Sequence, residues 1–160
     1  ICVKVIGQTI FSIGCTRRMG EKYMALHHQQ TDENTTIEQI KGEVREFISD
    51  RDWEQFHDPK NVAMALASEV GELLDIFRWV KSDDSFNILS DKDTYHDVQM
   101  ELADIAMFLM DLAMICEVDL TSAVMEKIKI NNQRYPIEKA RGIAEKYTKL
   151  AARSDKPNPE

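Results

Sequence analysis

Residues 58–81 read DPKNVAMALASEVGELLDIFRWVK, and this stretch decides the fold class. Asp58 followed by Pro59 is a typical helix start, because aspartate caps free N–H groups and proline needs no partner there. Apolar residues then recur at helical spacing. They are Val62, Leu66, Val70, Leu73 and Phe77. The pattern predicts one long amphipathic helix that runs to about Lys81.

Three further segments carry the same helical periodicity. Residues 36–39 (TIEQ) form a capping box that opens a first helix, whose apolar stripe reaches Ile48. A third helix is predicted from residues 91–93 to about Cys116, and a fourth, capped by Asp119 or Thr121, ends before Pro136. Four such segments with short connections predict an all-α, antiparallel four-helix bundle. The stripes on the second and third helices are broad enough to bury further area against a second subunit.

Composition limits the classes of protein. The 160 residues suit one domain, and 28 acidic against 20 basic residues give a net charge of −8, which argues against a nucleic-acid or anionic-membrane binder. Six glycines and four prolines argue against a turn-rich all-β fold. Cys2, Cys15 and Cys116 show no C-x-x-C spacing, so we expect neither disulfides nor a thiolate zinc site, and a reduced, cytoplasmic protein.

The two ends of the chain differ from the helical part. Residues 1–34 are interpreted as a poorly defined leader, with a natural start near Met19 or Met24, and are left out of the functional argument. Residues 35–150 are the predicted helical catalytic domain. Residues 151–160 are polar and contain proline, as is typical of a flexible tail.

Carboxylates interrupt the apolar stripes of the two central helices. Glu69 and Glu72 are three positions apart, as are Glu101 and Asp104, and Glu69 falls inside the stripe. One such pair is usually exposed, but two pairs turned toward one core would raise each other's pKa values unless a cation intervened. Oxygen ligands without His or Cys favour Mg²⁺ or Mn²⁺. The sequence therefore predicts a Mg²⁺ site, which is a usual device for holding phosphate oxygens.

Other chemistries fit less well. A di-iron bundle would need a Glu-x-x-His pair on each of two helices, and the one candidate, residues 54–57, lies in a connection. The sequence has no G-x-x-x-x-G-K-[ST] loop and no G-x-S-x-G elbow. Hydrolysis of a nucleoside triphosphate or another polyphosphate is the leading class.

Two groups of residues could bind such a substrate. On the fourth helix a set of polar side chains shares a face and could neutralise phosphate, although ordinary surface charge is an equal interpretation. The set is Lys127, Asn131, Arg134 and Tyr135. Trp53 and Trp79 lie at segment ends, where an indole ring can stack on a base, and core packing is their alternative.

These residues resemble those of the MazG-like all-α nucleotide pyrophosphohydrolases, whose signature is E-E-x-x-E followed by E-x-x-D. Here it reads SEVGE at residues 68–72 and ELAD at 101–104. Within this family the likeness is strongest to dCTP pyrophosphatases, through RDWEQFH at 51–57 and KIKINNQRYP at 127–136. It extends over about residues 37–150.

The resemblance implies roles for individual positions. Glu69, Glu72, Glu101 and Asp104 would bind Mg²⁺ and act in catalysis. Trp53, Trp79 and Phe108 would line the nucleotide pocket, with Lys127, Asn131, Arg134 and Tyr135 near the phosphates and sugar. The implied reaction splits the bond between the α- and β-phosphates, giving a nucleoside monophosphate and pyrophosphate. The implied assembly is a homodimer or homotetramer whose sites form between subunits.

The sequence departs from the family pattern at three positions, two of which belong to the implied substrate pocket. Ser68 stands at the position of the first signature glutamate, which dCTP pyrophosphatases also lack, so this loss is tolerable. Val44 stands where those relatives carry His, and Phe108 where they carry Tyr. Both changes remove a polar group, so another dNTP, such as dUTP or a damaged dNTP, remains an alternative to dCTP. A non-catalytic nucleotide-binding oligomer is a second alternative. The sequence does not assign the general base between Glu69 and Glu72.

Overall fold

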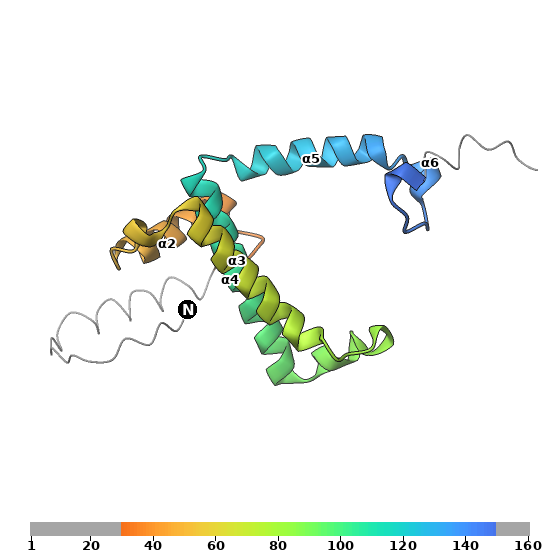
Figure 1. Ribbon diagram of the computed structural model, residues 1–160, viewed down its shortest axis with the longest axis horizontal. Coiled ribbons are helices and arrows are strands. Elements are labelled where there is room, and N and C mark those ends of the chain that lie inside the picture. Colours follow the sequence, from red (N-terminus) through yellow and green to blue (C-terminus); the bar gives the residue numbers. More distant parts are fainter. Residues whose placement is uncertain (1–29, 150–160) are drawn as a thin grey trace, which may run out of the picture. The chain divides into compact units, whose positions relative to one another are not determined.

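A computed structural model describes residues 30–149, which form helices joined by short connections (Figure 1). In chain order the elements are α2 (Ile37–Ser49), η1 (Glu54–Phe56), α3 (Pro59–Phe77), η2 (Ser82–Asp84), η3 (Asn87–Ser90), α4 (Lys92–Ile115), α5 (Leu120–Arg134) and α6 (Ile137–Ala140). No strand occurs in the described range, so the all-α prediction is confirmed. The predicted tail and most of the predicted leader lie outside it.

Side-chain caps fix where the long helices begin. Thr36 and Gln39 form the predicted capping box, with Gln39 N–H donating to Thr36 Oγ1 at 3.2 Å and Thr36 N–H to Gln39 Oε1 at 2.7 Å. Aspartate caps α3, α4 and α5 through Asp58, Asp91 and Asp119, each accepting a backbone N–H at 2.7–2.9 Å. The starts were therefore readable from sequence, and Asp119 rather than Thr121 caps α5.

The end of α3 corrects one prediction. The helix stops at Phe77 rather than near Lys81, because the backbone tightens into a turn in which Val80 N–H donates to Phe77 O at 3.0 Å. No glycine or proline marks this end. The following connection, predicted as a loop, holds the two short 3₁₀ helices η2 and η3.

Helices α2 and α4 both end in a left-handed residue that is not glycine. Asp52 has φ 52° and Glu117 has φ 54°. After α2, Trp53 N–H donates to Ile48 O at 3.1 Å and Asp52 N–H to Ser49 O at 2.9 Å, which is the Schellman pattern. After α4, Val118 N–H donates to Ala113 O at 2.8 Å in the same way. The first of these motifs fixes the backbone of Trp53.

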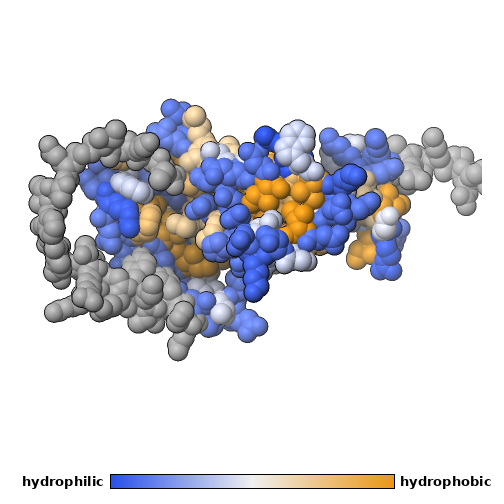
Figure 2. Space-filling model, turned by 90° about the horizontal axis from the view of Figure 1, so that it is seen from below, coloured by the Kyte–Doolittle hydropathy of each residue, from blue (hydrophilic) through white to orange (hydrophobic). Residues whose placement is uncertain are grey.

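The main helix contact of the second of the chain's two units, residues 41–160, is between α3 and α4. They run antiparallel, side by side, after the turn formed by η2 and η3 (Figure 1). In the described range the buried apolar residues are few: Val44, Ile48, Val62 and Ala113. Many large apolar side chains are exposed instead, and Figure 2 shows such side chains gathered in patches on one face.

Helix α5 buries none of its residues. Its predicted core positions Val124 and Ile128 are 48% and 46% exposed. The described part of the chain therefore supplies a helical pair with a small core, and a closed four-helix bundle within one chain stays a prediction. No helix among residues 30–149 is long and apolar enough to cross a membrane.

Candidate active site

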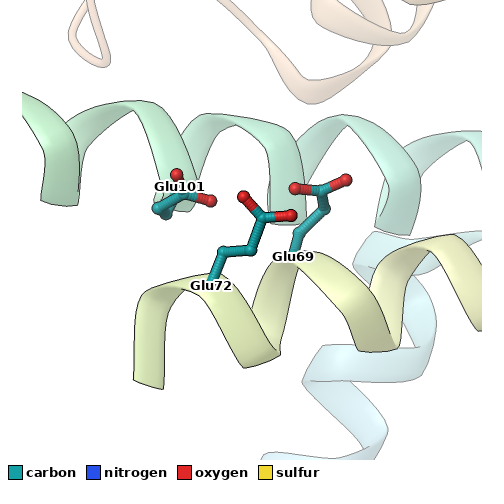
Figure 3. A group of neighbouring side chains, drawn as sticks. All are labelled: Glu69, Glu72 and Glu101. Carbon is teal, nitrogen blue, oxygen red and sulfur yellow. The ribbon is translucent and has the colours of Figure 1, made fainter. Parts of the chain in front are cut away.

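Three glutamates converge between α3 and α4. Glu69 and Glu72 extend from α3 and Glu101 from α4, and one carboxylate oxygen from each lies within 4.8 Å of the others (Figure 3). Spacing of three positions places the α3 pair on one side of that helix, and the antiparallel packing brings α4 opposite. The structure thus brings together three of the four carboxylates predicted from sequence.

The fourth predicted carboxylate, Asp104, lies at the margin. Its oxygens are not within the 4.8 Å group. Its charge nevertheless contributes to the raised pKa of both Glu69 and Glu101. It is therefore close enough to interact with the group and is exposed to solvent.

Burial sets the electrostatics of the site. Glu69 is 8% exposed, and this burial raises the pKa of its carboxyl, with Glu72, Asp104 and Glu101 adding to the rise. The pKa of Glu101 is raised first by burial and then by Glu72, Asp104 and Asp97. Ionisation of Glu69 and Glu101 in the metal-free chain therefore costs more free energy than ionisation of a carboxyl group in water.

One atom shows what the site lacks. Glu101 Oε2 is buried and, in the described part of the chain, has no hydrogen-bond partner. A buried acceptor without a partner is costly. A cation among the three carboxylates would supply a partner for this oxygen and would offset the repulsion between the negative charges. The donor set consists of carboxylate oxygens, which suit Mg²⁺ or Mn²⁺. The residues present thus fit such an ion.

The two tryptophans occupy different surroundings. Trp79 follows α3, is 89% exposed, and lines an open cavity of about 510 Å³ with Lys81, Asp84 and Asn87 among its neighbours. Trp53 is 36% exposed and meets the Phe47 ring edge-on at a centroid distance of 5.9 Å. Neither ring is buried in a core, so both can still stack on a ligand.

The predicted residues of α5 form a separate group. Lys127, Asn131 and Arg134 are exposed along α5, and Tyr135 follows its end. The Arg134 guanidinium lies 5.2 Å from the centre of the Tyr147 ring. No described contact joins this group to the glutamates, so its role stays a prediction. Phe108 is half-buried on α4, one turn after Asp104.

Sequence reasoning missed a buried acid with its own partner. Asp111, on α4, is 5% exposed and lies 2.7 Å from His57 Nδ1, through Oδ2. Asp111 stands among the apolar residues of its helix seven positions after Asp104, which is the same signal that revealed Glu69. His57, in the connection before α3, lies 54 positions away in sequence.

Comparison with known proteins identifies the class. The model of the MazG-like family matches residues 64–150, a range that includes α4, α5 and every carboxylate of the site. The chain belongs to the MazG-like family, as the signature in its sequence indicated. Trp53 and His57 lie before the matched range.

Individual relatives narrow the likeness. The chain is 43% identical to dCTP pyrophosphatase 1 of Mus musculus over 115 residues, 72% of this chain and 68% of that protein. It is 42% identical, over the same shares, to dCTP pyrophosphatase 1 of Homo sapiens. Among solved structures it matches a pyrophosphatase from Archaeoglobus fulgidus, with a TM-score of 0.59 and 34% identity, over 69% of this chain and 97% of that one.

Proposed function

We propose that this chain is a Mg²⁺-dependent nucleoside triphosphate pyrophosphatase that converts dCTP and water to dCMP and pyrophosphate. The observation that carries this is the convergence of Glu69, Glu72 and Glu101, with a buried Glu101 oxygen that has no partner among the described residues. The pyrophosphatase class is supported by the relatives, and dCTP is the substrate that the names of the curated relatives give.

The carboxylates account for metal binding. Glu69, Glu72 and Glu101 would hold Mg²⁺, with Asp104 beside them. A bound Mg²⁺ would supply the positive charge that neutralises the phosphate oxygens and the leaving pyrophosphate. Because the ligands must be deprotonated, the raised pKa values of Glu69 and Glu101 couple binding to proton release.

The remaining chemistry needs an attacking water and its base. A carboxylate of the Glu69 and Glu72 pair accepts the proton as the water oxygen bonds to the α-phosphorus. The bond from that phosphorus to the bridging oxygen breaks, and pyrophosphate leaves with the electron pair. Lys127 and Arg134 would neutralise phosphate charge that the metal site leaves uncovered.

The nucleobase of the substrate would be held by aromatic rings. Trp53 and Trp79 are partly or largely exposed and present flat faces, and Phe108 lies one turn beyond Asp104 on α4. Stacking on such rings tolerates different bases. Selection of cytosine therefore has to come from polar groups around the rings.

We also infer that the bundle closes between copies of this chain. Helix α5 buries nothing, and Leu74 of α3 is 63% exposed. Exposed apolar faces of this kind are typical of subunit interfaces. A homodimer, or a tetramer of two dimers, would cover them and could bring the α5 group of one copy to the glutamates of another. Light scattering coupled to gel filtration measures this assembly directly.

A direct assay tests the reaction. The full chain is incubated with each dNTP in turn, with and without Mg²⁺, and monophosphate and pyrophosphate are quantified by chromatography. We expect dCMP and pyrophosphate in equal amounts from dCTP, and none once a chelator removes the metal. Glu46→Gln, an exposed acid on α2, should behave as wild type. Nucleotide binding without product, independent of Mg²⁺, would instead identify a non-catalytic binder.

A second candidate function is the same reaction on a nucleotide with a different nucleobase. Val44 is 5% exposed within the core, and Phe108 has no hydroxyl, so neither side chain can hydrogen-bond a nucleobase at the two positions where the family resemblance implied a polar group. The same dNTP panel decides: faster turnover of dUTP or a damaged dNTP than of dCTP would select this alternative.

A further inference from the structure

The connection between α2 and α3 contains Trp53 and is tied to a helix at each of its two ends. At its start the Schellman motif of α2 ties Trp53 N–H to Ile48 O. At its end His57 reaches α4 and contacts Asp111. The centre of the Trp53 ring is 5.9 Å from that of Phe47 and 6.5 Å from that of His57, whose ring is tilted by 33° to the indole.

The His57–Asp111 contact is costly for a purely structural tie. Asp111 is 5% exposed, and a carboxylate taken out of water loses hydration that one partner only partly restores. Replacing a buried ion pair by well-packed apolar residues is often neutral or stabilising. What a directional contact supplies, and apolar packing does not, is a defined geometry for the group it holds.

The position of Asp111 on α4 relates the pair to the active site. Asp104, Phe108 and Asp111 are spaced by four and three positions, so they follow one face of the helix. Asp111 stands about 10 Å along the axis from Asp104, by the helical rise per residue. The helix face that carries Asp104 therefore passes Phe108 and reaches Asp111, where His57 joins the Trp53 connection to α4.

We propose that His57 and Asp111 are positioning residues for the nucleotide base, holding Trp53 beside the Phe108 face of α4. This rests on the proposed function, which places the base at Trp53. Asp111 would act through His57, the side chain that it contacts. Loosening the pair should raise KM for the nucleotide, whereas Mg²⁺ binding and the chemical step, set by the distant glutamates, change little.

The test compares Asp111→Asn with Asp111→Ala. Asparagine keeps an oxygen that can accept from His57 Nδ1, so we expect a several-fold rise in KM at most, while alanine removes the contact. For Asp111→Ala we expect KM for dCTP to rise roughly 10- to 100-fold, the scale of a displaced positioning group, with kcat within about threefold. Mg²⁺ affinity, measured by calorimetry without nucleotide, should match wild type.

Two controls separate positioning from loss of stability. Val62→Ala, at a 2%-exposed position of α3, weakens folding but leaves the His57 and Asp111 side chains in place, and its KM should stay at the wild-type value. Asp75→Asn breaks an exposed ion pair with Arg78 and should change neither parameter. Wild-type KM in both Asp111 variants, or a fall in kcat without a rise in KM, would overturn the proposal.

A spectroscopic readout keeps the test independent of activity. In a Trp79→Phe background Trp53 is the sole indole. Asp111→Ala in this background should shift Trp53 emission to longer wavelength and weaken its near-UV circular dichroism, because the ring loses its fixed surroundings. An unchanged spectrum overturns the positioning role. If wild type hydrolyses no dNTP, the proposed function fails, and the spectrum still decides whether the pair holds Trp53.

Discussion

Two acidic side chains of α4, Asp111 and Glu101, differ in how their buried oxygens are partnered. Asp111 has its partner within the chain, His57, at 2.7 Å. Glu101 has a buried oxygen with no partner in the described range and is surrounded by further carboxylates. We refer to His57 and Asp111 as the closed cluster, because the two side chains contact each other. We refer to Glu69, Glu72, Glu101 and Asp104 as the open cluster, for which we propose a bound cation. The contrast distinguishes an acid that is paired within the chain from one that we propose to bind an ion, and burial alone does not, because Asp111 and the Glu101 Oε2 atom are both buried.

The largest expected effect comes from removing a member of the open cluster. Glu72→Ala or Asp104→Ala should lower turnover by about 10³-fold or more, because the metal and its substrate charge are no longer held. Far-UV circular dichroism should show unchanged helicity, since both side chains are exposed. Near-wild-type release of pyrophosphate by both variants would refute the metal site.

Removing one partner of the closed cluster should cost stability instead. His57→Ala leaves Asp111 buried without its partner, and we expect a loss of about 3–5 kcal/mol in the free energy of unfolding. Urea titration measures it. A His57→Phe/Asp111→Leu double variant should recover most of the loss, since no charge is left buried. A double variant as unstable as the single would show that the pair itself stabilises the fold.

Neutralising one carboxylate of the open cluster should increase the stability of the metal-free protein rather than lower it. Glu69→Gln removes a carboxyl whose pKa is raised by burial and by neighbouring acids, so the metal-free protein should melt higher, by about 2 to 6 °C. Activity should be lost at the same time. Differential scanning fluorimetry in a chelator measures the melting temperature, and Glu46→Gln serves as the matched control. A lower melting temperature for Glu69→Gln would contradict the repulsion argument.

The pH dependence follows from the same shifts. A raised pKa means that the folded state binds the proton more tightly, so metal-free stability should fall as pH rises from about the ordinary carboxyl value of 4.5 through the raised values of Glu69 and Glu101. Above that window the cost is fully present. Added Mg²⁺ should reverse the trend, with an affinity that increases with pH. Urea midpoints at several pH values, with and without Mg²⁺, measure both slopes.

The sequence predicted what local pattern determines. The predicted starts of the long helices were correct because each start has a side-chain cap. Glu69 was predicted as a site residue because its carboxylate interrupts the apolar pattern of α3. The His57–Asp111 contact could not be found, since its partners lie 54 positions apart and depend on how the connection folds back. The early end of α3 at Phe77 carries no stop signal. The roles of Trp53, Trp79 and the α5 group stay predictions, because they concern a substrate.

Of the two left-handed residues, Glu117 marks where this chain could be engineered away from the proposed site, whereas Asp52 belongs to the motif that fixes Trp53. A non-glycine residue in that conformation stores strain of about 1–2 kcal/mol, which glycine does not carry. Asp52 recovers part of it, because its side chain accepts from Gln55 Nε2 at 3.0 Å. Glu117, at the turn into α5, has no such compensation among the described contacts, which makes it the better site for a thermostable variant of this protein.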